Sequence, residues 1–251
     1  GEYNMSAISF LGKLFGQSIS QNSFPSSNSE SAPRVSSQRV RRRGKDKQAV
    51  RVQDINGTPR ELGDRLAKGG EGDIRPLSGH DDVLVKTYHP HILTGQNGSH
   101  IERKLSGMKT FDALRTSSRF GWPRTLVYDE HGRFCGYAMH RMRGVSMQTL
   151  CQPQLIRERL PNWSRREAIT CARSFLCLVH TAHENGIILG DIQPANFLID
   201  PHTALVRGID CDSYQVTLGG NVFPCPVGIP MLLPPELIGK ELRTVKRTVE
   251  H

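Results

Sequence analysis

The sequence lacks the features that mark secreted, zinc-binding or membrane-spanning chains. Its six cysteines include no Cys-x-x-Cys pair, which argues against a zinc site and against the disulfide framework of a small secreted protein. No apolar run approaches the roughly 20 residues of a membrane-spanning helix, and the N-terminus has no basic-then-apolar signal peptide. We therefore expect a cytoplasmic protein.

Acidic residues are scarce relative to basic ones. The chain has 24 Asp and Glu against 33 Lys and Arg, a net charge of +9, and much of the excess lies in residues 34–47. Such a run is typical of contact with nucleic acid or an anionic membrane, and more often of a solvated tail. Both interpretations stay open on the sequence alone.

Residues 1–47 differ in composition from the rest of the chain. The stretch 16–38 is rich in Ser, Asn, Gln and Pro and has few apolar residues, so we expect residues 1–47 to form a disordered tail. The remainder is long enough to bury a sizeable core.

Two segments in the second half carry the residue types that phosphoryl transfer needs. Residues 190–196 read Gly-Asp-Ile-Gln-Pro-Ala-Asn, which places Asn196 five residues after Asp191, and Asp210 comes nineteen residues after Asp191. One carboxylate can orient or deprotonate an attacking hydroxyl, while an amide and a second carboxylate can hold Mg²⁺ against nucleotide phosphates. Asp212 is either a further metal ligand or a polar loop residue.

Upstream segments supply elements that bind phosphates. Gly69, Gly70 and Gly72 lie in an expected turn between two strands, where the absence of Cβ atoms lets backbone N–H groups approach phosphate oxygens. A short apolar strand, Val-Leu-Val-Lys, ends at Lys86, which matches the strand lysine that contacts α- and β-phosphates. Glu102, sixteen residues further on and on an expected helix, is the candidate ion-pair partner of Lys86.

In this order the motifs resemble the eukaryotic-like protein kinase superfamily over roughly residues 50–251. The resemblance is greatest to a bacterial branch of atypical kinase-like proteins. That branch carries Gly-Asp-x4-Asn, Ile-Asp-Cys-Asp-Ser and Pro-Pro-Glu-Leu, which begin here at residues 190, 209 and 234. It implies an α+β, two-lobed protein-kinase-like fold, with the small lobe over residues 48–142 and a partial large lobe over residues 143–251.

The resemblance also implies an activity, an ATP-dependent phosphotransferase of the serine/threonine protein kinase type that acts on a protein substrate with Mg²⁺ or Mn²⁺. A hinge over residues 139–142 would read adenine through its backbone. The implied site residues are the catalytic Asp191, Lys86 and Glu102, the metal ligands Asn196 and Asp210, and the cofactor-binding Gly69, Gly70, Gly72, Lys86, Met139 and Arg141.

Several positions depart from the common kinase pattern. The arginine expected before the catalytic aspartate is Gly190, the lysine two residues after it is Gln193, and the threonine expected before Pro230 is Ile229. That lysine and threonine ordinarily hydrogen-bond around the catalytic carboxylate and the γ-phosphate. The alternative function is therefore a pseudokinase, a nucleotide-binding or protein-binding signalling module.

Hydrophobic patterning and turn residues predict the local structure. We expect a capping box at Ser164 and Glu167 that starts a helix running to about residue 183. The expected strands lie near 50–55, 60–67, 73–77, 82–88, 124–128 and 133–140, and further helices near 100–116 and 148–157.

The expected large lobe is short at its C-terminal end. Only about fifteen residues follow Pro-Pro-Glu, where a kinase of ordinary topology has several more helices. We therefore expect the capped helix to expose an apolar patch within this chain, and we expect a partner protein or a C-terminal remainder to cover that patch. The apolar stripe that forms the patch consists of Ile169, Phe175, Leu176, Leu178 and Val179.

Limited proteolysis tests the expected tail. Digestion should remove residues 1–47 and leave a resistant fragment that begins near Val50, because a Ser-rich segment buries too little apolar area to offset its chain entropy. Mass spectrometry of the fragments locates the boundary. Protection throughout residues 1–47 of the isolated chain would contradict this prediction.

Overall fold

A computed structural model describes residues 50–250, so the predicted tail and its basic run lie outside the described residues. The strands are β1 (Val50–Gln53), β2 (Pro59–Leu62), β3 (Ala67–Lys68), β4 (Gly72–Leu77), β5 (His80–Tyr88), β6 (Pro123–Tyr128), β7 (Phe134–His140), β8 (Val145–Ser146), β9 (Phe197–Ile199), β10 (Val206–Gly208), β11 (Val216–Leu218) and β12 (Asn221–Phe223). The α-helices are α2 (Gln96–Met108), α3 (Asp112–Arg115), α4 (Pro153–Arg159) and α5 (Arg165–Glu184).

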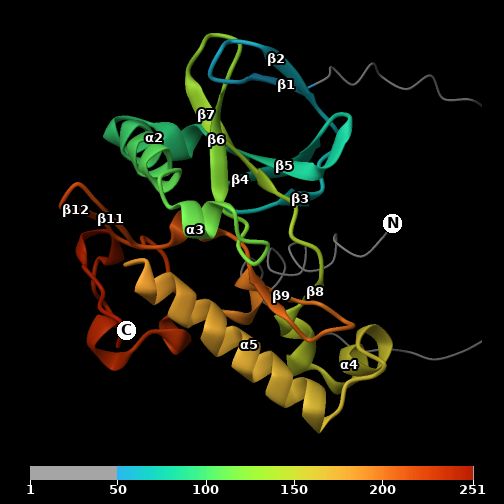
Figure 1. The fold of residues 1–251 in the computed structure, drawn as a ribbon. Coiled ribbons are helices and arrows are strands. Elements are labelled where there is room, and N and C mark those ends of the chain that lie inside the picture. Colours follow the sequence, from blue (N-terminus) through green and yellow to red (C-terminus); the bar gives the residue numbers. More distant parts are fainter. Residues whose placement is uncertain (1–49, 251) are drawn as a thin grey trace, which may run out of the picture.

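Strands β1 to β7 form an antiparallel barrel, the upper part of Figure 1. Their order is β2-β1-β6-β7-β5-β4-β3, and an additional pairing of β2 with β4, between Leu62 and Leu77, closes the sheet over six strands. A buried apolar cluster takes one side chain from each of five strands, namely Val52, Leu62, Val85, Val127 and Ala138. Burial of this cluster stabilises the barrel.

The two faces of β5 have different environments. Val85 belongs to the barrel cluster, whereas Leu84, Lys86 and Tyr88, two residues apart, share the opposite face. In the neighbouring strand β7, Tyr137 lies opposite Lys86 and Met139 lies opposite Leu84. Because directly paired residues of adjacent strands share a face, Lys86 and Tyr137 point to the same side of the sheet.

Helix α2 packs on the outside of the barrel (Figure 1). Trp122 is buried, and its indole N–H donates a hydrogen bond of 2.8 Å to the carbonyl of Met108, the last residue of α2. The neighbouring Gly121 N–H donates to the carbonyl of Gly208, the last residue of β10, also at 2.8 Å. This segment thus ties the end of α2 to the strand that leads into Asp210.

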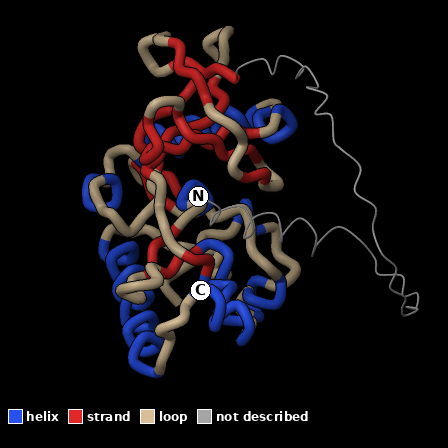
Figure 2. The backbone as a smooth tube through the Cα atoms, turned by 90° about the vertical axis from the view of Figure 1, so that its right-hand side faces the viewer, coloured by secondary structure: helices blue, strands red, loops and turns tan. Residues whose placement is uncertain are grey.

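The second part of the chain is mainly helical, below the barrel in Figures 1 and 2. Strands β8, β9 and β10 form a small sheet, and α5 packs against β10. The predicted capping box is confirmed: the Ser164 hydroxyl accepts from the Arg166 N–H at 3.1 Å, and the Glu167 carboxylate accepts from the Ser164 N–H at 3.0 Å. The helix therefore starts where the sequence predicted.

Two of the expected helices differ from the prediction in their extent. The helix expected over residues 100–116 runs instead from Gln96 to Met108, and residues 112–115 form the separate short helix α3. The helix expected over residues 148–157 is divided into a 3₁₀ turn (Met147–Cys151) and α4. Helix α4 begins at Pro153 because proline has no N–H to donate and suits the first position of a helix.

The apolar stripe on α5 is only partly exposed. Leu178 is fully buried, and Phe175 packs edge-on against Phe197 with ring centroids 5.0 Å apart. Ile169 and Leu176 are 56% and 65% exposed. The predicted patch thus shrinks to these two side chains, and its covering by a partner protein or a C-terminal remainder stays a prediction.

Within residues 50–250, no helix combines the length and the apolar character needed to cross a membrane.

Substitutions on α5 should separate its buried side from its exposed side. Leu178→Ala should lower the free energy of unfolding by about 2–5 kcal/mol, because it leaves a cavity in the core. Leu176→Ala, the matched change on the exposed side, should stay within ~0.5 kcal/mol of the parent. Urea titration followed by circular dichroism measures both, and equal losses would show that the orientation of α5 is wrong.

Candidate active site

A cavity of about 640 Å³ lies between the barrel and the helical part. This volume is within the range typical of small-molecule sites. Apolar side chains from both parts line it: Leu66, Ile74, Leu84 and Met139 from the barrel, and Met142, Leu198 and Ile209 from the rest of the chain. Four of the predicted site residues with polar side chains line the same cavity, namely Lys86, Asp191, Asn196 and Asp210.

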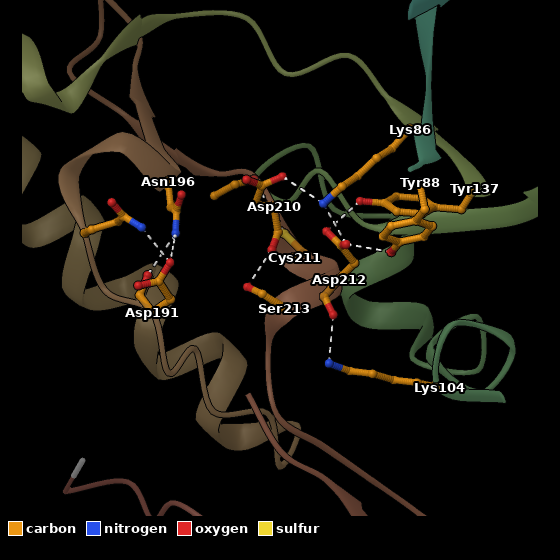
Figure 3. A network of polar contacts seen from close by, with 12 residues as sticks. Lys86, Tyr88, Lys104, Tyr137, Asp191, Asn196, Asp210, Cys211, Asp212 and Ser213 are labelled. Atoms are coloured by element: carbon orange, nitrogen blue, oxygen red, sulfur yellow. Dashed lines mark hydrogen bonds and ion pairs between the residues drawn. The ribbon is translucent and has the colours of Figure 1, made fainter. Parts of the chain in front are cut away.

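Lys86 is buried in the cavity wall and forms ion pairs with two carboxylates. Its Nζ lies 2.7 Å from Oδ2 of Asp212 and 3.4 Å from Oδ1 of Asp210. The Asp212 side chain is 4% exposed and that of Asp210 is 51% exposed. The lysine therefore joins a carboxylate of the interior to one that faces the cavity (Figure 3).

The Asp212 carboxylate accepts hydrogen bonds on both oxygens (Figure 3). The Tyr88 hydroxyl donates to Oδ2 at 2.7 Å, and the Tyr137 hydroxyl donates to Oδ1 at 2.7 Å. Lys104, from α2, donates to the backbone carbonyl of Asp212 at 2.7 Å. Asp212 is thus held by strands β5 and β7 and by helix α2. This geometry agrees with neither interpretation made from the sequence, which were a further metal ligand and a plain loop residue.

Burial and charge act in opposite directions in this network. Burial favours the neutral form of Asp212, but Lys86 and the two tyrosine hydroxyls hold the pKa of the carboxyl below its ordinary value. Burial likewise opposes the charge on Lys86, yet Asp210 and Asp212 raise the pKa of its amine. Burial lowers the pKa of Lys104 to about 8, so the second buried amine is held less firmly in its charged form.

The prediction that Glu102 pairs with Lys86 is wrong. Both carboxylates paired with Lys86 come from the segment 210–212, and Glu102 instead lies near Tyr128 on β6, where its charge adds to the effect of burial in raising the pKa of that hydroxyl. The register of α2 explains the error, because Lys104 and Leu105 are buried while Glu102 is only half-buried. Helix α2 therefore presents an amine to the network where an acid was expected.

Asp191 is buried and accepts hydrogen bonds from two side-chain amides. The Gln193 Nε2 lies 2.6 Å from its Oδ2, and the Asn196 Nδ2 lies 2.8 Å from the same oxygen. The Asn196 Nδ2 also donates to the Asp191 carbonyl at 3.0 Å. Gln193, in the position of the expected lysine, thus makes a neutral hydrogen bond where the lysine would bring a charge.

Asp210 has a backbone conformation that is uncommon for a residue with a side chain. Its φ and ψ are 56° and 35°, in the left-handed region. It is followed by the 3₁₀ turn Cys211–Ser213, and its carbonyl accepts from the Ser213 N–H at 3.1 Å and from the Ser213 hydroxyl at 2.8 Å. Such strain is characteristic of functional sites, and here the turn directs residues 210 and 212 to Lys86 together.

Asn196 and Asp210 offer oxygen ligands of the kind that Mg²⁺ or Mn²⁺ prefers. The amide nitrogen of Asn196 is used by Asp191, so its oxygen remains as a possible ligand. In the part of the chain that the structure describes, no group of three or more His, Cys, Asp or Glu side chains is placed to hold a metal. One amide oxygen and one carboxylate form a partial ligand set of the kind that a metal completes with phosphate oxygens and water.

The three glycines of the predicted phosphate loop all line the cavity. They differ in their surroundings. A Cβ at Gly72 would lie 2.3 Å from the carbonyl oxygen of Thr87, whereas a Cβ at Gly70 would meet no atom within 4 Å. Gly72 is required by the close approach of β4 to β5, and Gly70 is free to face a ligand. Glu71 lies between these two glycines in the sequence and near Lys86. Burial raises the pKa of its carboxyl.

The predicted hinge is partly corrected. Met139 lines the cavity, but Arg141 is absent from its lining and the Arg141 N–H donates to the Asp82 carbonyl at 2.8 Å. Met142 lines the cavity instead. The position of Arg141 therefore does not support the predicted cofactor contact, because its amide extends the pairing of β7 with β5.

Gly190 is explained by an arginine from far along the chain. Its φ is 75°, and a Cβ there would lie 2.5 Å from Cβ of Cys225 and 2.7 Å from a guanidinium nitrogen of Arg247. Arg247 is buried and donates to the carbonyls of Gly190 and Val227. Its backbone N–H and carbonyl each form a 2.8 Å hydrogen bond with the Gln215 side chain.

Comparison with curated proteins adds an independent finding. The chain is 28% identical over 192 residues to a protein named protein kinase YegI from Escherichia coli strain K12, an alignment that covers 75% of this chain and 28% of that protein. It is 28% identical over 179 residues to protein kinase YegI of Escherichia coli O157:H7, covering 70% of this chain and 26% of that protein. The chain spans about a quarter of the length of these relatives. No family model matches it.

Paired glycine substitutions test the packing around Asp191. Gly186→Ala should cost about 1–2 kcal/mol of unfolding free energy, because Gly186 has a φ of 69° but open space around it. Gly190→Ala should cost a further 1–3 kcal/mol or so through overpacking against Cys225 and Arg247. Denaturant unfolding measures the difference, and equal costs would mean that Arg247 does not occupy this space.

Proposed function

We propose that residues 50–250 form a two-lobed, protein-kinase-like unit that binds ATP with Mg²⁺ or Mn²⁺ and transfers a phosphoryl group to a serine or threonine hydroxyl of a protein. The observation that carries the proposal is the convergence of Lys86, Asp191, Asn196 and Asp210 on one cavity between a barrel and a helical part. The similarity to proteins named protein kinase supports the same class of activity.

The proposed role of each residue follows from its chemistry and place. Asp191 accepts hydrogen bonds from two amides and orients the acceptor hydroxyl or takes its proton. Asn196 and Asp210 hold the metal, which when bound neutralises charge on the phosphates. Lys86 positions the α- and β-phosphates. Positioning and charge stabilisation supply most of the rate enhancement in such a reaction.

The same cavity supports the proposed recognition of the nucleotide. The backbone of Gly69 and Gly70 covers the phosphates, and the apolar walls formed by Leu84 and Leu198 enclose the adenine ring. The backbone near Met139 and Met142 reads the edge of adenine, which is where β7 leaves the barrel. Met142 takes the place in the proposal that the sequence assigned to Arg141.

A second candidate function is supported by Gln193. A neutral amide next to Asp191 cannot contribute the positive charge that a lysine would bring to the γ-phosphate. This favours a pseudokinase that binds nucleotide and acts through its conformation. The two functions share the binding step and differ in phosphoryl transfer.

Binding and transfer can be measured separately. ATP with Mg²⁺ should raise the unfolding temperature, because a ligand that binds only the folded state stabilises it by about 2.7 kcal/mol at a hundred times its dissociation constant. Asp210→Asn should remove the metal-dependent part of this shift. Asp81→Asn serves as the control, since Asp81 is exposed and does not line the cavity.

Transfer is tested with labelled ATP and mixed protein acceptors. Asp191→Asn should lower transfer by about 10²–10⁴-fold, the usual contribution of a positioned acid or base, with ATP binding retained. Binding without any transfer by the parent chain would favour the pseudokinase. Absence of an ATP-dependent shift at millimolar ATP in the folded parent chain would refute the cavity assignment itself.

A further inference from the structure

We infer that Asp212 is the residue that positions Lys86 for nucleotide phosphates, the role that the sequence had assigned to Glu102. This inference rests on the proposed nucleotide site and goes beyond it. It assigns to the buried pair of Lys86 and Asp212 the selective recognition of the phosphate part of the ligand.

The hydrogen bonds of Asp212 exclude the alternative that it is a metal ligand. Oδ2 accepts from Lys86 and Tyr88, and Oδ1 accepts from Tyr137, each at 2.7 Å. The side chain is 4% exposed. A metal at Asp212 would have to displace these donors from a buried carboxylate, whereas the half-exposed Asp210 lines the cavity.

The network also fixes the direction of the Lys86 side chain. Lys86 and Tyr88 lie on the same face of β5, and Tyr137 lies opposite Lys86 on β7. Both tyrosine hydroxyls meet the carboxylate that binds the amine (Figure 3). The Lys86 Nζ is therefore held between Asp212 and Asp210, at the cavity wall, and little side-chain freedom remains to be lost when a phosphate binds.

Asp212 and Asp210 are also linked to each other. They lie at either side of Cys211 in one short turn, and Lys104 anchors the Asp212 carbonyl from α2 at 2.7 Å. Fixing Asp212 therefore fixes the backbone from which Asp210 reaches toward Lys86. One buried carboxylate positions both charged groups that the proposed function assigns to the phosphates and their metal.

The test compares ligands that differ only in their phosphates. Asp212→Asn, which keeps the size of the side chain and removes its charge, should weaken the binding of ATP and ADP by about 10–100-fold, as the loss of an orienting partner does. Adenosine binding should be unchanged. A general structural defect would weaken all three ligands together, and this result would overturn the inference.

A double-mutant cycle shows whether Asp212 acts through Lys86. In a Lys86→Met background, the further change Asp212→Asn should cost much less ATP affinity than it does in the parent, because residues that act as one unit are not additive; the part that remains is its effect on Asp210. Full additivity of the two losses would overturn the inference. Glu102→Gln tests the rival partner: a loss of ATP affinity there, with none in Asp212→Asn, would also overturn it.

The substitution Tyr137→Phe gives a second test of the inference that leaves the charge of the network unchanged. It removes one donor to Asp212 and should weaken ATP about threefold, with adenosine affinity retained, so the inference remains testable if circular dichroism shows Asp212→Asn to be unfolded. If the folded parent chain binds none of the three ligands, the proposed function fails. If the parent binds them but Tyr137→Phe and Asp212→Asn bind ATP as the parent does, the inference alone fails.

Discussion

The ion pair between Lys86 and Asp212 is the interaction on which the described arrangement depends. Both charges are buried, and a buried charge is tolerated only when paired and hydrogen-bonded. Tyr88 of β5 and Tyr137 of β7 donate further hydrogen bonds to the Asp212 carboxylate, and Lys104 of α2 donates one to the Asp212 carbonyl. The outer face of the barrel, helix α2 and the turn after β10 therefore all contact Asp212. These contacts fix the charged groups that form the polar wall of the cavity.

Local features of the fold could be predicted from the sequence because their causes are local. The capping box needs only Ser164 and Glu167 at the right spacing, and most strands follow from alternation and turn residues. The strand expected over residues 60–67 was wrong, because the structure divides it into β2 and β3. The separation of five residues placed Asp191 and Asn196 at one site, although the hydrogen bonds between them were not predicted. The placement of Lys86 on the cavity side of β5 follows from its even spacing to Leu84 and Tyr88.

The predictions that failed, and the residues that were missed, depend on contacts between segments distant in the sequence. The register of α2 decides whether Glu102 or Lys104 faces inward, and the helix sequence alone does not determine it. Tyr137 could have been found by pairing β5 with β7, because it stands opposite Lys86. Arg247 could not, since nothing near Gly190 in the sequence indicates that a guanidinium 57 residues away fills the space beside it. Gly190 is therefore a packing requirement as well as a departure from the kinase pattern.

The closure of the barrel by β2 and β4 limits how this part of the protein can meet other chains. An open sheet presents unpaired N–H and C=O groups along its outer strands, which accept an additional strand from another molecule. Here β2 and β4 are joined through the pair of Leu62 and Leu77, and the strand left at the end of the sheet order is β3, with two residues. The closure thus removes part of the open edge, and the strand beyond it is short, so an added strand finds less backbone to pair with there than on an open sheet.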